Sequence, residues 1–287
     1  MKKTIALWAV LTAVALFATT GCTAADADAP SGGVPKAAPT VGDKAPDAAP
    51  DAAAAAAAAR TAAYRKWGLK PFPAPPAPPA KKPVQRRAAG GPVPVVSDIE
   101  TDQKIVFVTI DDGAEKDPRF VEMMRDLKVP VTMFLTDASI RSDYPYFARL
   151  AAEGNGIGNH TLTHPNLRTL SAEAQHREIC GQQAKLTKEY GRPPRLFRPP
   201  YGNWNEATRA AADQCGLDAI VLWRESMQIQ NMQYQRGDKK LHPGDIILAH
   251  FRGPSELKGR TMTQMMANLL RHIQEQGFTV ARLEDYL

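Results

Sequence analysis

The chain has 287 residues and a formal net charge of +6 at pH 7, but its parts differ sharply in composition. Residues 22–100 hold 24 alanines and 14 prolines, and a segment with so few large apolar side chains cannot bury enough surface to offset its chain entropy. Residues 101–287 hold 24 basic against 23 acidic side chains, so the composition predicts one folded domain there and excludes a two-domain enzyme, a small disulfide scaffold and a DNA-binding face.

The first 21 residues have the layout of a secretory signal peptide. Two lysines precede an apolar run over residues 5–17, which is shorter than the roughly 20 residues that a membrane-spanning helix needs. Gly21-Cys22 then resembles a bacterial lipobox, although Thr19 stands where such motifs usually have Leu. The resemblance implies export and a lipid anchor on Cys22 at the outer face of the cytoplasmic membrane; secretion with loss of Cys22 is the alternative.

Residues 22–100 are expected to form a tether. Residues 71–83 are rich in proline, which is typical of polyproline II, a conformation that extends about 3.1 Å per residue. Upstream, Asp51 can cap an alanine helix, and Tyr64 and Trp67 are the large side chains at its end. A solvated tether is favoured, and docking of these two aromatic side chains on the folded domain is the alternative.

From residue 104 the sequence alternates short β-branched runs with stretches of helical periodicity. This alternation predicts a parallel sheet with helices on its faces, either an open doubly wound sheet or a barrel. Strands are expected at 105–110, 131–135, 218–222 and 246–248, with weaker ones near Ile157, Leu196 and Thr279, and helices at 117–128, 143–153, 171–190, 205–215 and 261–276.

Unusual polar residues follow five of these strands. The carboxyl ends of parallel strands meet at one edge of a sheet, where α/β enzymes assemble their active sites. The groups are Asp111-Asp112, His160 with His164, the segment 198–202, Trp223 and His250. Their convergence predicts an enzyme rather than a structural domain.

The paired histidines and aspartates predict a metal site. His160 and His164 are four residues apart, close to one helical turn, so both imidazoles can face one ion. A carboxylate from Asp111 or Asp112 would complete a two-His, one-carboxylate site with an open position. Two adjacent carboxylates at the end of a buried strand repel each other, which favours a cation over an ordinary Asp-Gly turn. The second Asp, held near Arg198, would be free to act as a base.

Four of these segments together resemble a known family. Thr109-Ile-Asp-Asp-Gly113, His160-Thr-Leu-Thr-His164, Arg198-Pro-Pro-Tyr-Gly202 and Leu248-Ala-His250 are similar, in order and in placement, to motifs of the polysaccharide deacetylases, the NodB-like carbohydrate esterase family 4. The resemblance covers about residues 103–287. It implies an irregular (β/α)7 barrel and metal-dependent removal of N- or O-acetyl groups from carbohydrate polymers.

The resemblance also implies roles for the residues of the first three motifs. Asp112, His160 and His164 would hold a divalent metal, with Zn favoured and Co or Ni as alternatives. Asp111 would be the catalytic base, and Arg198 would orient it.

The later segments carry the remaining implied roles and one departure from the family. His250 would be the general acid, Leu248 and Trp223 would line the acetyl pocket, and the backbone N–H of Tyr201 would help to hold the oxyanion. The Asp that usually tunes the acid His is missing from residues 222–226. Glu225 can replace it if it points the same way as Trp223, toward His250 or Arg198; an exposed Glu225 is the alternative.

Two further features concern the periphery of the domain. Cys180 and Cys215 fall on successive expected helices, and an oxidising compartment predicts a disulfide between them; two buried thiols are the alternative. Residues 225–244 are long and polar, and they are expected to form a lid or sugar platform or, alternatively, a plain surface loop.

The sequence thus predicts a signal peptide at 1–21, a tether at 22–100 and a catalytic domain at 101–287. The expected function is deacetylation of an N-acetylglucosamine-containing polysaccharide, such as peptidoglycan or chitin, by an exported monomer with no nucleic-acid partner. A catalytically silent metal- and sugar-binding lipoprotein is one alternative, because the altered fourth motif permits it. An O-acetyl esterase on xylan or peptidoglycan is another, because the sequence does not separate amide from ester hydrolysis.

Overall fold

The computed structural model describes residues 48–85 and 91–287. The expected signal peptide and Cys22 lie outside these residues. Within the described part of the chain, no helix combines the length and the apolar character needed to span a bilayer.

The described residues contain one sheet of ten strands, and its paired strands are parallel except for the hairpin β7–β8. The order is β1-β6-β5-β4-β3-β2-β9-β7-β8, with β10 beside β2. The bounds are β1 Val95–Val96, β2 Ile105–Asp112, β3 Val131–Leu135, β4 Gly156–Asn159, β5 Leu196–Phe197, β6 Ala219–Val221, β7 Glu225–Met227, β8 Met232–Tyr234, β9 Ile246–His250 and β10 Thr279–Val280. Every strand expected from the sequence is present, and this parallel α/β architecture agrees with the predicted irregular (β/α)7 barrel.

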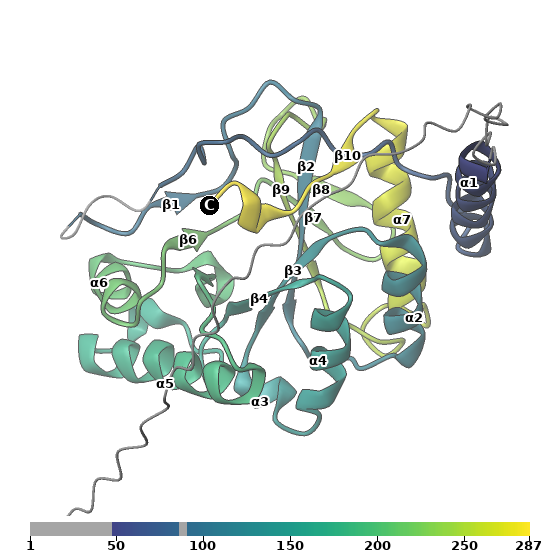
Figure 1. Ribbon diagram of the computed structural model, residues 1–287. Coiled ribbons are helices and arrows are strands. Elements are labelled where there is room, and N and C mark those ends of the chain that lie inside the picture. Colours follow the sequence, from purple (N-terminus) through teal and green to yellow (C-terminus); the bar gives the residue numbers. More distant parts are fainter. Residues whose placement is uncertain (1–47, 86–90) are drawn as a thin grey trace, which may run out of the picture. The chain divides into compact units, whose positions relative to one another are not determined.

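Helices flank the sheet, as Figure 1 shows, with α2, α4 and α7 near one another and α5 packed beside α6. Each of the five helices expected in the domain is confirmed, and the short helix α3 was not anticipated. Their ends follow local chemistry: Thr261 and Gln264 form a capping box at the start of α7, and α5 ends at Gly191 with φ 73°. The helices are α1 Ala48–Lys66, α2 Pro118–Leu127, α3 Asp137–Ile140, α4 Tyr144–Ala152, α5 Ala172–Tyr190, α6 Glu206–Gln214 and α7 Met262–Glu275.

The segment before residue 101 is not a solvated tether throughout: the alternative holds, and Tyr64 and Trp67 are both buried against the folded domain. The side chains of Tyr64, Leu69 and Phe72 are buried in the main core, and the Tyr64 hydroxyl donates a hydrogen bond to the Leu127 carbonyl over 2.8 Å. Further along, Val93 is fully buried and β1 pairs with β6. The folded unit therefore begins well before residue 101. A few large side chains among many Ala and Pro residues are enough to hold the segment in place.

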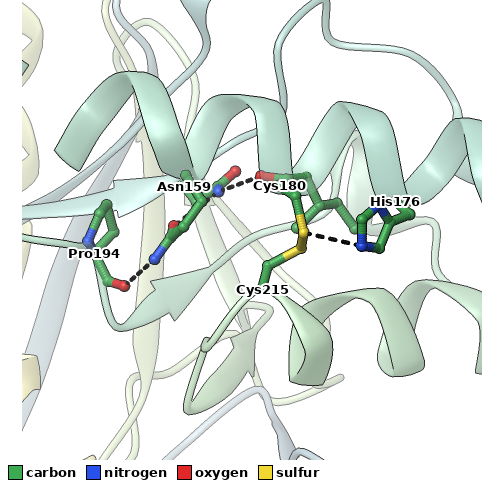
Figure 2. Close-up of a disulfide and its surroundings, with 7 residues drawn as sticks. Asn159, His176, Cys180, Pro194 and Cys215 are labelled. Atoms are coloured by element: carbon green, nitrogen blue, oxygen red, sulfur yellow. Dashed lines mark hydrogen bonds between the residues drawn. A yellow bond between two sulfur atoms is a disulfide. The ribbon is translucent and has the colours of Figure 1, made fainter. Parts of the chain in front are cut away.

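Cys180 on α5 and Cys215 at the C-terminus of α6 are joined by a disulfide (Figure 2). The two cysteines are 35 residues apart in the sequence, so the bond closes a substantial loop in the unfolded chain. Such a cross-link stabilises mainly by restricting the unfolded state.

Replacing Cys180 and Cys215 together by serine is expected to lower the free energy of unfolding by about 2 to 4 kcal/mol. Denaturant titration of the variant and the wild type measures this difference. In a Cys22→Ala background, the denatured but unreduced protein should contain no free thiol. Two free thiols in that assay would show that the bond does not form.

Candidate metal centre and active site

The segment 160–164 follows β4 as a loop, so the expectation that its two histidines are spaced by a helical turn is wrong. Thr161 and His164 have φ values of 69° and 59°, in the left-handed region that non-glycine residues seldom adopt. Asp112 and Tyr201, also at this end of the sheet, have φ values of 75° and 60°. Strained backbone of this kind is typical of functional sites, where the surroundings hold it in place.

The loop nevertheless brings both imidazoles to one carboxylate. Nε2 of His164 lies 3.2 Å and Nε2 of His160 lies 3.6 Å from Oδ1 of Asp112. Nδ1 of His160 is 2.7 Å from the carbonyl oxygen of Arg198, which can only accept, so this nitrogen carries the proton. The lone pair of the neutral ring is therefore on Nε2, facing Asp112.

These three side chains fit a divalent metal ion. Their ligand atoms all lie within 4.8 Å of one another. Burial would raise the pKa of Asp112, but the adjacent imidazoles of His160 and His164 lower it well below the usual range, so the carboxylate is ionised. Two imidazoles and a carboxylate suit Zn and its neighbours in the transition series. The carbonyl that orients His160 is the type of outer partner common behind metal-binding histidines.

Asp111 occupies a different environment from its neighbour Asp112. It is 3% exposed, and its Oδ1 accepts a hydrogen bond from Nη1 of Arg198 over 2.7 Å. Its Oδ2 lies 3.8 Å from Nε2 of His160. The structure thus brings Arg198 and Asp111 together as the sequence predicts, with Oδ1 bound to Arg198 and Oδ2 toward His160.

Arg198 is fully buried and held on every side. It donates to the Thr109 hydroxyl and to the carbonyls of Val221 and Leu222, and its guanidinium lies 4.3 Å from the centre of the Phe134 ring. Burial lowers the pKa of Arg198 while Asp111 opposes that shift, and a guanidinium remains charged across the working range of an enzyme. Thr109 belongs to the first family-like motif, but the contact of its hydroxyl with Arg198 was not expected from the sequence.

His250 ends β9 directly opposite Asp111 in the β2–β9 register. Burial lowers the pKa of His250, and the charges of Asp111 and Asp112 partly oppose that shift. Leu248 is buried two residues earlier in the same strand, on the same side as His250 because side chains alternate along a strand.

A cavity of about 210 Å³ lies beside the loop that carries Tyr201. Tyr201 is 63% exposed, and its ring lies 4.8 Å from the ring of His164. A Cβ on Gly202 would come within 3.1 Å of the Trp223 ring, so Trp223 packs tightly on this turn. Besides these three residues, the cavity is lined by Ser97, Leu222 and Gln235. Ser97 and Gln235 were missed because they come from the expected tether and the expected loop.

Glu225 does not occupy the position that the sequence suggested, and neither expectation for it is correct. It is fully buried, and its Oε1 lies 3.5 Å from Nη1 of Arg236. In β7 it pairs with Ile247, three residues before His250, which places it about 10 Å back along the sheet. The charged groups that shift the pKa of His250 do not include Glu225. The pair β7–β8 also replaces much of the loop expected over 225–244.

Glu225 should instead make stability depend on pH. Burial, with the nearby Asp245, raises its pKa to about 8. A carboxyl whose pKa rises on folding binds its proton more tightly in the folded state, so the free energy of unfolding falls as the pH rises from about 4.5 through about 8. Glu225→Gln is expected to reduce this decline, and its gain over the wild type should be largest above pH 8.

Denaturant titrations across this pH range measure the effect, with the exposed Glu256→Gln as the control. Parallel pH profiles for the wild type and Glu225→Gln would contradict the assignment.

At the strand ends of this parallel α/β fold, two imidazoles and an ionised carboxylate lie beside a second carboxylate that a buried arginine holds, which is the kind of arrangement found in enzyme active sites. Residues 98–220 match the polysaccharide deacetylase family. The chain belongs to this family, and relatives with a named activity are deacetylases, which hydrolyse amide bonds other than peptide bonds.

Similar proteins cover most of the same region. An uncharacterized protein of Streptomyces coelicolor, SCO4760, is 44% identical over 195 residues, which are 68% of this chain and 77% of the relative. A peptidoglycan-N-acetylglucosamine deacetylase of Bacillus cereus is 26% identical, over 67% of this chain and 92% of the relative. The structure of BA3943 from Bacillus anthracis, a pseudoenzyme of carbohydrate esterase family 4, matches with a TM-score of 0.56 at 22% identity, over 67% and 68% of the two chains. This last similarity supports the fold alone.

Proposed function

We propose that the protein is a metal-dependent deacetylase that removes acetyl groups from N-acetylglucosamine units of a polysaccharide, with peptidoglycan as the first candidate. The observation that carries the proposal is the pairing of two carboxylates with different surroundings. Asp112 lies against His160 and His164, whereas Asp111 is tied to a buried Arg198. Two adjacent carboxylates in separate environments can take the separate roles of ligand and base.

Asp112, His160 and His164 would hold the metal ion, with Zn first and Co or Ni as alternatives. When bound, such an ion would supply Lewis-acid polarisation of the acetyl carbonyl. The other residues of the site act directly on the substrate and on its protons.

Asp111 would accept a proton from the attacking water through Oδ2, the oxygen that Arg198 does not bind, while Arg198 keeps the carboxylate in place. His250, opposite Asp111, would donate a proton to the departing nitrogen. The backbone N–H of Tyr201 would stabilise the developing oxyanion. Leu248 and Trp223 would contact the acetyl methyl group.

A catalytically silent sugar-binding protein is the second candidate. It is favoured by one observation: Glu225 lies among Arg236 and Asp245, so the departure in the fourth motif is not compensated by this residue. An esterase acting on O-acetyl groups would use the same machinery on a different bond.

Acetate release separates these candidates. The purified protein is incubated with peptidoglycan, chitin oligomers and acetylated xylan, each with chelator and with added Zn. Release from the N-acetylated polymers that chelator stops and Zn restores supports the proposal. Release from acetylated xylan alone indicates an esterase, and absence of release together with retained polymer binding indicates the silent protein.

We also propose that the protein is exported and anchored in the membrane through a lipid on Cys22, on the support of the signal-like N-terminus. Cys22→Ala is then expected to move the protein from the membrane fraction into the medium. A wild-type protein that is already in the medium, with a mature start after residue 22, would contradict the anchor.

A further inference from the structure

One face of helix α5 contacts the metal-ligand loop, defined here as residues 160–164. The Glu178 carbonyl accepts a hydrogen bond from the Leu162 N–H over 3.2 Å. The Glu178 carboxylate accepts two more, from the N–H of Thr163 over 2.9 Å and from its hydroxyl over 2.8 Å. These bonds hold the part of the loop that lies between His160 and His164.

The same helix also supports the residue that precedes His160. The Asn159 side-chain amide donates to the Ile179 carbonyl over 2.9 Å and to Oε1 of Gln183 over 3.0 Å, and Figure 2 shows Asn159 beside this turn of α5. Its Oδ1 accepts from the Thr161 N–H over 3.0 Å. Asn159 is fully buried, so it connects α5 to the loop without competition from water.

Gly181 lies in the middle of α5, where glycine is among the least favourable residues. Its φ is not in the left-handed region, so backbone conformation does not require glycine here. A Cβ built on Gly181 would lie 2.5 Å from Cδ1 of Leu162, and its three nearest atoms all belong to the Leu162 side chain. The Leu162 side chain therefore occupies the space that a side chain at residue 181 would fill.

The residues on either side of Gly181 fix the helix from other directions. Cys180 is bonded to Cys215, and Figure 2 shows this bond joining α5 to α6. Gln182 donates to the Leu135 carbonyl over 2.7 Å, and the same carbonyl accepts from the N–H of His160 over 3.1 Å. Residues 178–183 are thus anchored to α6 and to β3 while they hold the loop.

We propose that α5 sets the position of the metal-ligand loop, and that Gly181 and Leu162 are positioning residues for His160 and His164. The part that concerns metal rests on the proposed function. A methyl group on residue 181 would force the Leu162 side chain to move, and we infer that the loop backbone moves with it and carries both imidazoles along. Metal sites depend on such outer support, whose loss typically weakens metal binding about 10- to 100-fold.

Gly181→Ala tests the proposal, because the added methyl group meets Leu162. We expect Co²⁺ affinity of the purified protein to fall about 10-fold, with a changed visible absorption spectrum of the bound ion. In the metal-free protein, amide hydrogen exchange at Leu162 and Thr163 should become faster. If Gly181→Ala only stabilised the helix and did not press on Leu162, neither the Co²⁺ affinity nor the amide exchange of the loop would change in this way. Arg177→Ala, at an exposed position of the same helix, is the matched control.

A double-mutant cycle tests whether the effect of Gly181→Ala on the loop depends on the Leu162 side chain. In a Leu162→Ala background, the further change Gly181→Ala should leave both Co²⁺ affinity and amide exchange unaltered. Unchanged exchange at Leu162 and Thr163 in Gly181→Ala would overturn the proposal. So would an effect of Gly181→Ala that is as large in the Leu162→Ala background as in the wild type. If the wild type bound no metal, the metal site of the proposed function would fail, while the exchange measurements would still decide the role of Gly181.

Discussion

Replacing both His160 and His164 by alanine is expected to abolish stoichiometric metal binding and, with it, acetate release. In the proposed site the two imidazoles supply two of the three protein ligands, and Asp112 alone would offer a single, half-buried carboxylate. Elemental analysis of the purified protein after dialysis measures the bound metal. Loss of one imidazole should weaken binding, and loss of both should remove it.

The matched control for this variant is the pair His242→Ala and His272→Ala. These histidines lie near acidic side chains, Asp238 and Glu275, but outside the cluster at the strand ends. The control pair should keep one metal ion per chain. Stoichiometric metal in the His160, His164 double variant would show that the site is elsewhere.

Asp111→Asn is expected to lower the rate of acetate release about 1,000-fold while metal binding is retained. General base catalysis contributes typically 10²- to 10⁴-fold, and an amide of the same shape can still accept from Arg198 but cannot take a proton. Turnover and metal content are measured on the same preparation. Asp117→Asn, which changes a helix N-cap, is the control for general effects on folding.

The two readouts distinguish the possible roles of Asp111. Lost activity with full metal content supports the base. Lost activity with lost metal would make Asp111 a ligand, and unchanged activity would exclude it from the reaction.

The central strands could be predicted because they are long or strongly β-branched, and the polar residues that end them are unusual in such positions. Strands β7 and β8 were missed because each has three residues within a polar stretch, too short for a periodic pattern. The candidate ligand residues were predictable because polar residues are unusual directly after such strands. The loop conformation that brings His160 and His164 together was not, because left-handed φ values at Thr161 and His164 depend on tertiary contacts.

Composition misled the prediction for the N-terminal segment. An average over residues 22–100 is dominated by Ala and Pro, but burial depends on individual side chains such as Tyr64 and Phe72. Similarly, strand alternation suggested the direction of Glu225 but not its distance from His250, which follows from the register of β7 against β9.

The docked N-terminal segment limits how far the enzyme could work from a membrane. With a lipid on Cys22, the proline-rich residues 71–83 would add nothing to the span, because Phe72 within this stretch and Val93 beyond it belong to the folded unit. The span would then come from residues 22–47, whose fully stretched contour is about 90 Å at about 3.6 Å per residue. If the proposed anchor is present, this contour together with the dimensions of the folded domain would set the distance from the membrane within which the active site meets its polymer.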